Sequence, residues 1–140
     1  MPKLLKKSLG VEHKNCYKNE DYLVVFDNED QISQISPDFN KLALLDLRGV
    51  IITSPGKDYD FVSRAFFPKY GIFEDPVTGS AHTMLAPYWS KKLNKSELKA
   101  KQISKRGGEL FCRNEGNRVF ISGYAKLYMF GEIHLTEANS

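Results

Sequence analysis

The stretch from Ser80 to about Leu93 constrains the fold most, because as a helix it would be apolar on nearly all sides until Lys91. Alanine, methionine, leucine, tyrosine and tryptophan follow one another through it and leave no wide polar face. A helix of that kind is usually buried in a protein rather than lying on its surface. We therefore expect a helix here with the other elements packed around it. Pro87 lies inside the stretch and predicts a bend or a local loosening of the helix.

Short runs of β-branched and aromatic residues, bounded by turn residues, predict the strands around this helix. The expected strands are Tyr22–Phe26, Val50–Thr53, Phe61–Phe67, Leu98–Ser104, Glu109–Asn114, Arg118–Ser122 and one or two within Ala125–Leu135. In the last of these, Gly131 indicates a bulge or bend. About six or seven strands with one apolar helix make an α+β domain.

Three further segments have clear local signals. Asn28–Ile35 predicts a helical turn, and Ser36-Pro37-Asp38 predicts a helix start in which the serine caps and the proline takes the first position. Residues 69–79 contain two glycines, a proline and several charges, and predict a loop.

Length and composition favour a single folded domain. The chain has 140 residues, of which 41% are hydrophobic and 12% aromatic, enough for a real core. The sequence has no apolar run near 18 residues and no secretory signal pattern at its N-terminus. Its two cysteines, Cys16 and Cys112, lie far apart, which argues against a disulfide framework and predicts a reducing, cytoplasmic location.

The charges are nearly balanced and give a net charge of +3. Six lysines between Lys91 and Lys105 form the most basic stretch, so a nucleic-acid-binding module is one possible function. Glu97 interrupts these lysines and few aromatic residues alternate with them, which favours an ordinary solvated face. The three histidines are isolated and show no spacing typical of metal ligands.

The loop before the apolar helix, EDPVTGSAH at 74–82, gathers groups that can do chemistry. Thr78, Gly79 and Ser80 lie where the chain enters the helix, and free N–H groups at a helix start attract a carboxylate or phosphate. Gly79 would allow a positive φ or a close backbone approach. Asp75 precedes a proline, which favours extended backbone, and its carboxylate could move a proton or orient an amine.

An ordinary capped helix explains the same residues. Thr78 or Ser80 could serve as the N-cap, Asp75-Pro76 as a turn, and His82 as a satisfied polar group. Spacing alone favours this capping interpretation over a ligand site. The sequence around Ser80 has no GxSxG motif, and no glycine-rich phosphate motif is present.

Four longer strings resemble one known family. They are Ser63–Pro68 (SRAFFP), Gly71–His82 (GIFEDPVTGSAH) with Leu85–Trp89 (LAPYW), and Gln102–Gly108 (QISKRGG). Together they resemble the phenazine-biosynthesis-like (PhzF-like) isomerases, and the resemblance spans essentially the whole chain. It implies a diaminopimelate-epimerase-like fold, in which a curved, barrel-like sheet of antiparallel or mixed strands surrounds a central helix. Two such domains, related by pseudo-symmetry, enclose the active site in that family.

The resemblance also implies a chemistry, an isomerisation by proton transfer that uses no cofactor and no metal. By the match, Asp75 corresponds to the family's active-site aspartate. Gly79 and Ser80 would line the substrate pocket and hold a carboxylate, while Thr78 and Ala81 would shape the loop. The resemblance gives no defined role to Arg64 or His82, for which core packing, ion pairing or scaffolding are equally compatible.

The chain matches only the C-terminal half of the family. The principal general acid/base there is a glutamate of the N-terminal half, and Glu74 is no substitute because it lies beside the aspartate in the same motif. We expect an isolated domain, a split gene or a non-catalytic relic that binds a ligand or protein, with negligible turnover by the chain alone. Half of an active-site cleft also predicts a partner, either a second copy or a separately encoded N-terminal half. We expect no nucleic-acid or membrane partner.

Overall fold

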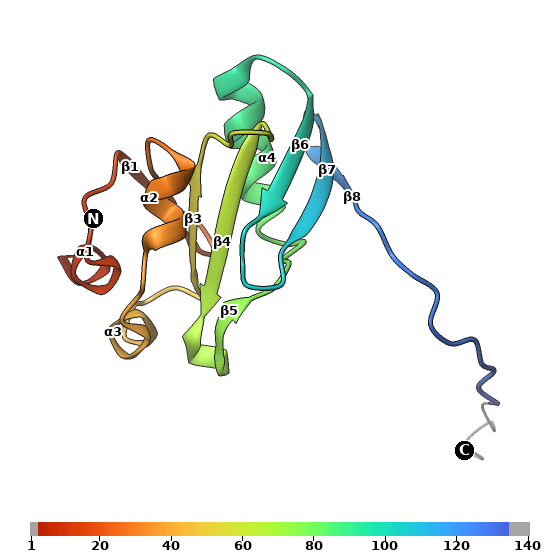
Figure 1. Cartoon of the computed structure of the whole chain (residues 1–140), viewed down its shortest axis with the longest axis horizontal. Coiled ribbons are helices and arrows are strands. Elements are labelled where there is room, and N and C mark those ends of the chain that lie inside the picture. Colours follow the sequence, from red (N-terminus) through yellow and green to blue (C-terminus); the bar gives the residue numbers. More distant parts are fainter. Residues whose placement is uncertain (1–2, 135–140) are drawn as a thin grey trace.

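The computed structural model describes residues 3–134, and within them one mixed sheet carries helices on both of its faces (Figure 1). The helical elements are α1 (Lys3–Leu9), α2 (Glu29–Gln34), α3 (Phe39–Ala43), the 3₁₀ turn η1 (Pro68–Tyr70) and α4 (His82–Leu93). The strands are β1 (Asn15–Lys18), β2 (Tyr22–Val25), β3 (Val50–Ser54), β4 (Phe61–Phe67), β5 (Ile72–Asp75), β6 (Glu97–Gln102), β7 (Gly108–Glu115) and β8 (Arg118–Ser122). The predicted α+β class is therefore confirmed.

The strand order is β1-β2-β3-β4-β6-β7-β8, with β5 paired to β4 beside this path. The pairs β2/β3 and β4/β6 are parallel, and all the others are antiparallel. Among residues 3–134 the sheet does not close on itself, because β1 and β8 each pair with a single neighbour. The barrel-like closure expected from the resemblance is thus not found within the described part of the chain.

Strand β4 has two partners on the same edge, and this arrangement positions the candidate site. Its first half pairs with β6, whereas its second half pairs with β5, with Ala65 opposite Asp75. The C-terminal ends of β5 and β6 consequently lie close together. The loop that leaves β5 reaches the end of β6 before it enters α4.

Alternating residues of the central strands belong to two separate hydrophobic cores. Val24, Ile52 and Val62 belong to a cluster shared with residues of α1, α2 and α3. Their sequence neighbours, such as Leu23 and Ile51, belong to a second cluster with residues of α4. This period-two alternation is the expected consequence of a sheet covered on both faces.

Helix α4 packs against one face of the sheet, and its other side faces solvent. Leu85, Ala86 and Trp89 are buried, but Thr83 and Pro87 are exposed. The prediction of a helix buried on all sides is therefore wrong for the described chain. Methionine, tyrosine and proline look apolar in a sequence, yet they can border a surface without being enclosed. The helix continues through Pro87, and a bend there stays a prediction.

Three predicted segments differ from the structure. In the predicted loop 69–79, residues 72–75 instead form β5, because the second half of β4 has an edge that β6 leaves open. Ser36 does not cap α3; the carboxylate of Asp38 accepts the hydrogen bond from the N–H of Lys41. Residues 125–134 form no strand and Gly131 no bulge, although the outer edge of β8 is unpaired among the described residues, and Leu135 lies outside those residues.

The polar N-terminal region holds α1 and β1, which have no strong sequence signal. No helix within residues 3–134 has the length and apolar character needed to span a bilayer. Both cysteines are free thiols.

Candidate functional site

Asp75 ends β5 and is anchored to the loop that follows it. The hydroxyl of Thr78 donates to Asp75 Oδ2 at 2.5 Å. The backbone carbonyl of Asp75 accepts a hydrogen bond from Gln102 Nε2 at 2.7 Å. The side chain of Asp75 is half-buried, so the carboxylate is oriented by the fold yet still reachable. That combination suits a group that must exchange a proton with a bound molecule.

Gln102, at the end of β6, clamps this loop. Its Oε1 accepts from the Thr78 N–H at 2.8 Å, and its Nε2 also donates to Thr78 Oγ1 at 3.1 Å. Gln102 is fully buried, so these bonds form away from competing water. The side chain occupies the inward face of β6, after Leu98 and Ala100 in the alternation. A glutamine at a position where the alternation of β6 calls for an apolar residue was the available signal of a buried polar role. The sequence analysis assigned this glutamine no role.

The turn after β6 also contacts the loop that follows Asp75. Ser104 Oγ donates to the Pro76 carbonyl at 2.7 Å and accepts from the Gly107 N–H at 3.0 Å. Gly107 has a φ of +70°, and a Cβ added to Gly108 would lie 2.3 Å from a methyl group of Val77. The two glycines are therefore required by a left-handed turn and by close contact with the loop.

The turn at 79–81 contains backbone N–H groups that no other group in the described chain accepts. The first turn of α4 is closed by bonds to carbonyls three residues back, such as His82 N–H to Gly79 O at 3.0 Å. The N–H groups of Gly79, Ser80 and Ala81 have no acceptor among residues 3–134. Gly79 and Ser80 are exposed, whereas the methyl group of Ala81 lies in the core. Three consecutive free donors at a helix start form a suitable seat for a carboxylate.

Two details of this turn differ from the sequence analysis. Helix α4 begins at His82, and neither Thr78 nor Ser80 caps it through a side chain. Gly79 has no positive φ, and a Cβ there would meet nothing within 4 Å. The chain itself therefore does not require a glycine at 79, and the capping interpretation of these side chains is wrong.

Arg48 is a second residue at this turn that sequence reasoning missed. Its guanidinium makes two bonds to the buried carboxylate of Asp21, Nε to Oδ1 at 3.0 Å and Nη2 to Oδ2 at 2.6 Å. The same Nη2 lies 3.4 Å from Ser80 Oγ. Arg48 comes from the end of the α3–β3 connection, far from the motif in sequence. It places a guanidinium, already paired with Asp21, beside the Ser80 hydroxyl.

Arg64 and Glu74 have structural roles. Arg64 makes two bonds to Glu74, at 2.7 and 3.0 Å, and also donates to the carbonyls of Ile32 and Ile35 at the end of α2. Glu74 and Asp75 are adjacent in β5 and thus point to opposite faces. Ion pairing is the role found for Arg64, and Glu74 is turned away from the candidate site.

His82 supports the loop from inside the core. Its Nδ1 lies 2.8 Å from the Thr78 carbonyl, and because a carbonyl can only accept, Nδ1 carries the proton and Nε2 is an unprotonated acceptor. Nε2 has no partner among residues 3–134, and the ring lies 5.9 Å from that of Phe61. Burial lowers the pKa of His82, although the Thr78 carbonyl opposes this shift.

We expect His82 to make the fold sensitive to mild acid. Its pKa is lowered on folding, so below about pH 6.5 the unfolded chain binds the proton more readily and the free energy of unfolding falls. Because of this one group, the free energy of unfolding falls by at most about 1.4 kcal/mol for each pH unit. Urea titrations at pH 7.0 and 5.5 should show a smaller difference for His82→Gln than for the unchanged chain.

Burial also lowers the pKa of His13, so His13→Gln measures the separate contribution of this second histidine to the acid sensitivity. An acid-induced loss of stability that is equal in the unchanged chain and in His82→Gln would contradict the assignment to His82.

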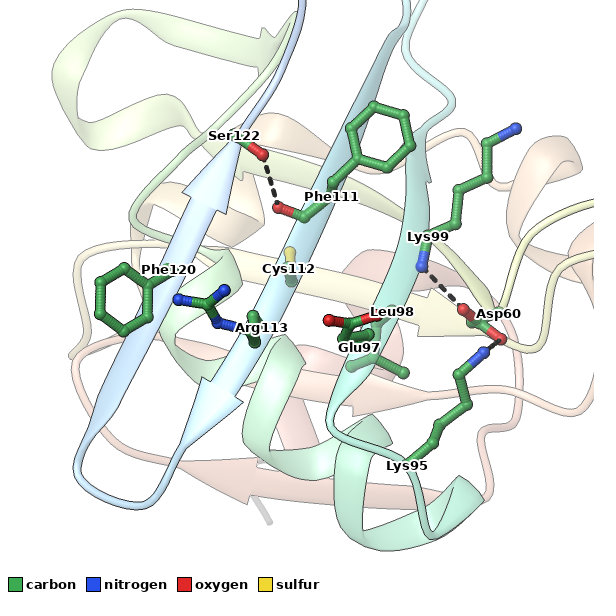
Figure 2. A pocket seen from close by; sticks show the side chains of 10 residues that line it. All are labelled: Asp60, Lys95, Glu97, Leu98, Lys99, Phe111, Cys112, Arg113, Phe120 and Ser122. Atoms are coloured by element: carbon green, nitrogen blue, oxygen red, sulfur yellow. Dashed lines mark hydrogen bonds and ion pairs between the residues drawn. The ribbon is translucent and has the colours of Figure 1, made fainter.

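Two of the hollows beside the sheet differ in their relation to the candidate site. One, of about 780 Å³, adjoins the candidate site and is lined by Val77, Gly79, Arg106–Leu110 and Ile121–Tyr124. The other, of about 590 Å³, lies over β6, β7 and β8 and is drawn in Figure 2. Its lining includes none of the site residues predicted from the sequence. Burial raises the pKa of its one thiol, Cys112, to about 11, so this cysteine stays protonated at neutral pH and is a poor nucleophile.

The lysines of 91–105 are divided among different surroundings. Lys95 pairs with Asp60 at 2.7 Å, as Figure 2 shows. Lys99 and Lys101 lie over the ring of Tyr59, while Lys91 and Lys92 belong to the last turn of α4. This distribution is that of a solvated face, and the expected absence of a nucleic-acid partner stays a prediction.

Comparison with known proteins points to one family. The model of the family described as "Phenazine biosynthesis-like protein" matches residues 5–131. An uncharacterized isomerase of Pseudomonas aeruginosa is 50% identical over 134 residues, which cover 96% of this chain and 52% of that protein. A phenazine biosynthesis-like domain-containing protein of Homo sapiens is 45% identical over 95 residues, covering 62% of this chain and 33% of that protein.

Solved structures give the same result. A crystal structure of a phenazine biosynthesis protein of the PhzF family from Enterococcus faecalis superposes with a TM-score of 0.88 at 47% identity. The superposition covers 96% of this chain and 52% of that one. The chain thus spans about half the length of the bacterial relatives it matches.

Proposed function

We propose, because this chain belongs to the phenazine biosynthesis-like (PhzF-like) family, that it forms one side of the active site of a cofactor-independent isomerase or epimerase. The reaction is a proton transfer on a small, cyclic amino acid-like carboxylate. One observation carries the proposal. The carboxylate of Asp75 is oriented by Thr78, and the free N–H groups of residues 79–81 follow it directly.

Each part of the site has a separate task in this proposal. The N–H groups of Gly79, Ser80 and Ala81 hold the substrate carboxylate, and Arg48, whose charge is balanced by Asp21, places a further N–H donor beside Ser80. Asp75 exchanges a proton with the substrate or orients its amine. Thr78 and Gln102 do not touch the substrate; they fix the position of Asp75. An exposed Gly79 keeps side-chain bulk away from the bound carboxylate.

The site is completed by a second domain of the same family in this proposal. The resemblance implies that the main general acid/base, a glutamate, comes from that domain, and that the two domains have similar barrel-like folds. Proton transfer needs both groups placed within a fraction of an ångström, and an open half-site leaves the substrate in water. The described chain is therefore inactive alone. The proposal includes a cytoplasmic location, supported by two free cysteines.

The test is to add the missing half. We define the complementary half as the part of the Pseudomonas aeruginosa relative outside the 52% that this chain matches. Both parts are co-expressed, and cyclic amino acids and dihydroaromatic amino acids are incubated with the complex in D₂O. Mass spectrometry should show deuterium uptake on carbon only when both parts are present. A folded complex without uptake for any such substrate would instead support a non-catalytic binding module.

A further inference from the structure

Ser63 and His82 each bury one side-chain atom that has no hydrogen-bond partner among residues 3–134. The atoms are Ser63 Oγ and His82 Nε2, and the two residues are 1% and 0% exposed. Buried atoms of His13 and Asn114 also lack a partner, but those two residues are only half-buried and border solvent. A fully buried hydroxyl or ring nitrogen without a partner is costly, so native proteins nearly always pair such groups with other protein groups or with ordered water.

Ser63 is the middle member of a polar row that crosses the sheet on the face that α4 covers. It lies opposite Thr53 of β3 on one side and opposite Gln102 of β6 on the other. The hydroxyl of Thr53 accepts a hydrogen bond from Trp89 Nε1 at 3.0 Å and donates to a backbone carbonyl. Gln102 is bonded to the loop after β5. Within residues 3–134, Ser63 is therefore the member of the row that is left unpaired.

Two contacts place the imidazole of His82 over the same row. Its ring lies 5.9 Å from that of Phe61, which precedes Ser63 by two residues and therefore points to the same face of β4. Its Nδ1 is bonded to the carbonyl of Thr78, and the N–H of Thr78 is bonded to Gln102. The imidazole thus contacts neighbours of Ser63 on its own strand and across β6, so the two unpaired atoms lie in the same part of the core.

One water molecule suits these two atoms in chemistry and in size. Nε2 can only accept a hydrogen bond, whereas a serine hydroxyl can donate one, so a water can donate to the nitrogen and accept from the hydroxyl. The side chains nearby on this face are small, because Ala65, Ala81 and Ala100 belong to the same core cluster. A polar site that is closed to solvent, with at least two partners, is where buried water is found in proteins.

We propose that one enclosed water molecule bridges Ser63 Oγ and His82 Nε2 and thereby fixes the imidazole that supports the Thr78 loop. The bridge connects the middle of β4 to the carbonyl of Thr78. The hydroxyl of Thr78 in turn bonds Asp75, so the water site contributes to the position of that carboxylate. The water site does not depend on the proposed function, since every group in it belongs to this chain.

A crystal structure of the 140-residue chain that resolves ordered water tests the site directly. We expect one density peak within about 2.7–3.2 Å of both atoms. In solution, the ¹⁵N resonance of His82 Nε2, assigned by its loss in His82→Gln, reports the same contact. At about pH 7.5 the lowered pKa of His82 keeps the ring neutral, and the resonance should be that of a nitrogen that accepts a hydrogen bond.

Ser63→Ala and Ser54→Ala form a matched pair of variants. Both serines are buried, but Ser54 lies on the opposite face of the sheet and its hydroxyl bonds the carbonyl of Pro55. Ser63→Ala removes one partner of the water, so the density peak should be lost and the Nε2 resonance should shift toward that of an unbonded nitrogen. The Thr78 amide should exchange at least about threefold faster. Ser54→Ala should change none of these readouts.

Three results would overturn the water site. They are a direct hydrogen bond between the two side chains, no density peak between them, and an Nε2 resonance that is the same in Ser63→Ala as in the unchanged chain. Equal exchange of the Thr78 amide in the two serine variants would remove the link to the loop alone. The unchanged chain tests the site even where a variant fails to fold, and no readout depends on turnover or on a second domain.

Discussion

Asp75→Asn should lower the rate of proton exchange in the completed enzyme by about 10²- to 10⁴-fold, the usual contribution of a positioned acid/base group. Asparagine has nearly the same shape and can still accept the hydrogen bond from Thr78, so the loop should keep its structure. The loss should therefore appear in the chemical step rather than in complex formation. Deuterium uptake into the substrate, measured at saturating substrate, gives the rate.

The matched control is Asp58→Asn, an exposed aspartate in the loop between β3 and β4. It removes the same charge without touching the candidate site and should leave the rate within about twofold. An Asp75→Asn enzyme as fast as the Asp58→Asn enzyme would show that Asp75 is not the acid/base group.

Gln102→Met should destabilise the chain by about 3 kcal/mol, because it removes all three side-chain bonds of the clamp at nearly constant volume. The buried Thr78 N–H and the Asp75 carbonyl are then left without partners, and each such group costs about 1–3 kcal/mol. Urea unfolding measures the stability. Hydrogen exchange at the Thr78 amide should accelerate more than exchange in the central strands.

Lys99→Ala is the control on the same strand, since this residue is exposed on the opposite face of β6. Its effect should stay within about 0.5 kcal/mol. A Gln102→Met chain that loses less than about 1 kcal/mol, or whose Thr78 amide exchanges at the usual rate, would mean that the clamp does not hold the loop.

The sequence predicted the regular elements well where the local signal was strong. The strands at 61–67 and 118–122 agree with the structure to the residue, and the helix of 80–93 differs by two residues at its start. Predictions failed where strand pairing decides whether a segment becomes a strand. β5 forms at the free edge of β4, whereas residues 125–134 form no strand even though β8 also has a free edge within the described chain.

The residues of the candidate site also fall into two groups, those with a local sequence signal and those without one. Asp75, Thr78, Gly79 and Ser80 are contiguous in sequence, so a motif could point to them. Arg48 and Gln102 come from other elements, and no local pattern brings them to the loop. Their contacts depend on the turn after β6 and on the strand order, both of which are long-range features.

By itself, the sequence determined the residue types of the loop, the resemblance that gives them a chemistry, and the fact that the match extends over only half of the family's length. Tertiary structure alone decided which backbone N–H groups of the loop are hydrogen-bonded within the chain and which remain free. Thr78 N–H is bound by a glutamine 24 residues away, whereas the next three N–H groups have no acceptor among residues 3–134. The physical reason is that hydrogen-bond satisfaction depends on every neighbour in space, and a sequence lists only neighbours along the chain.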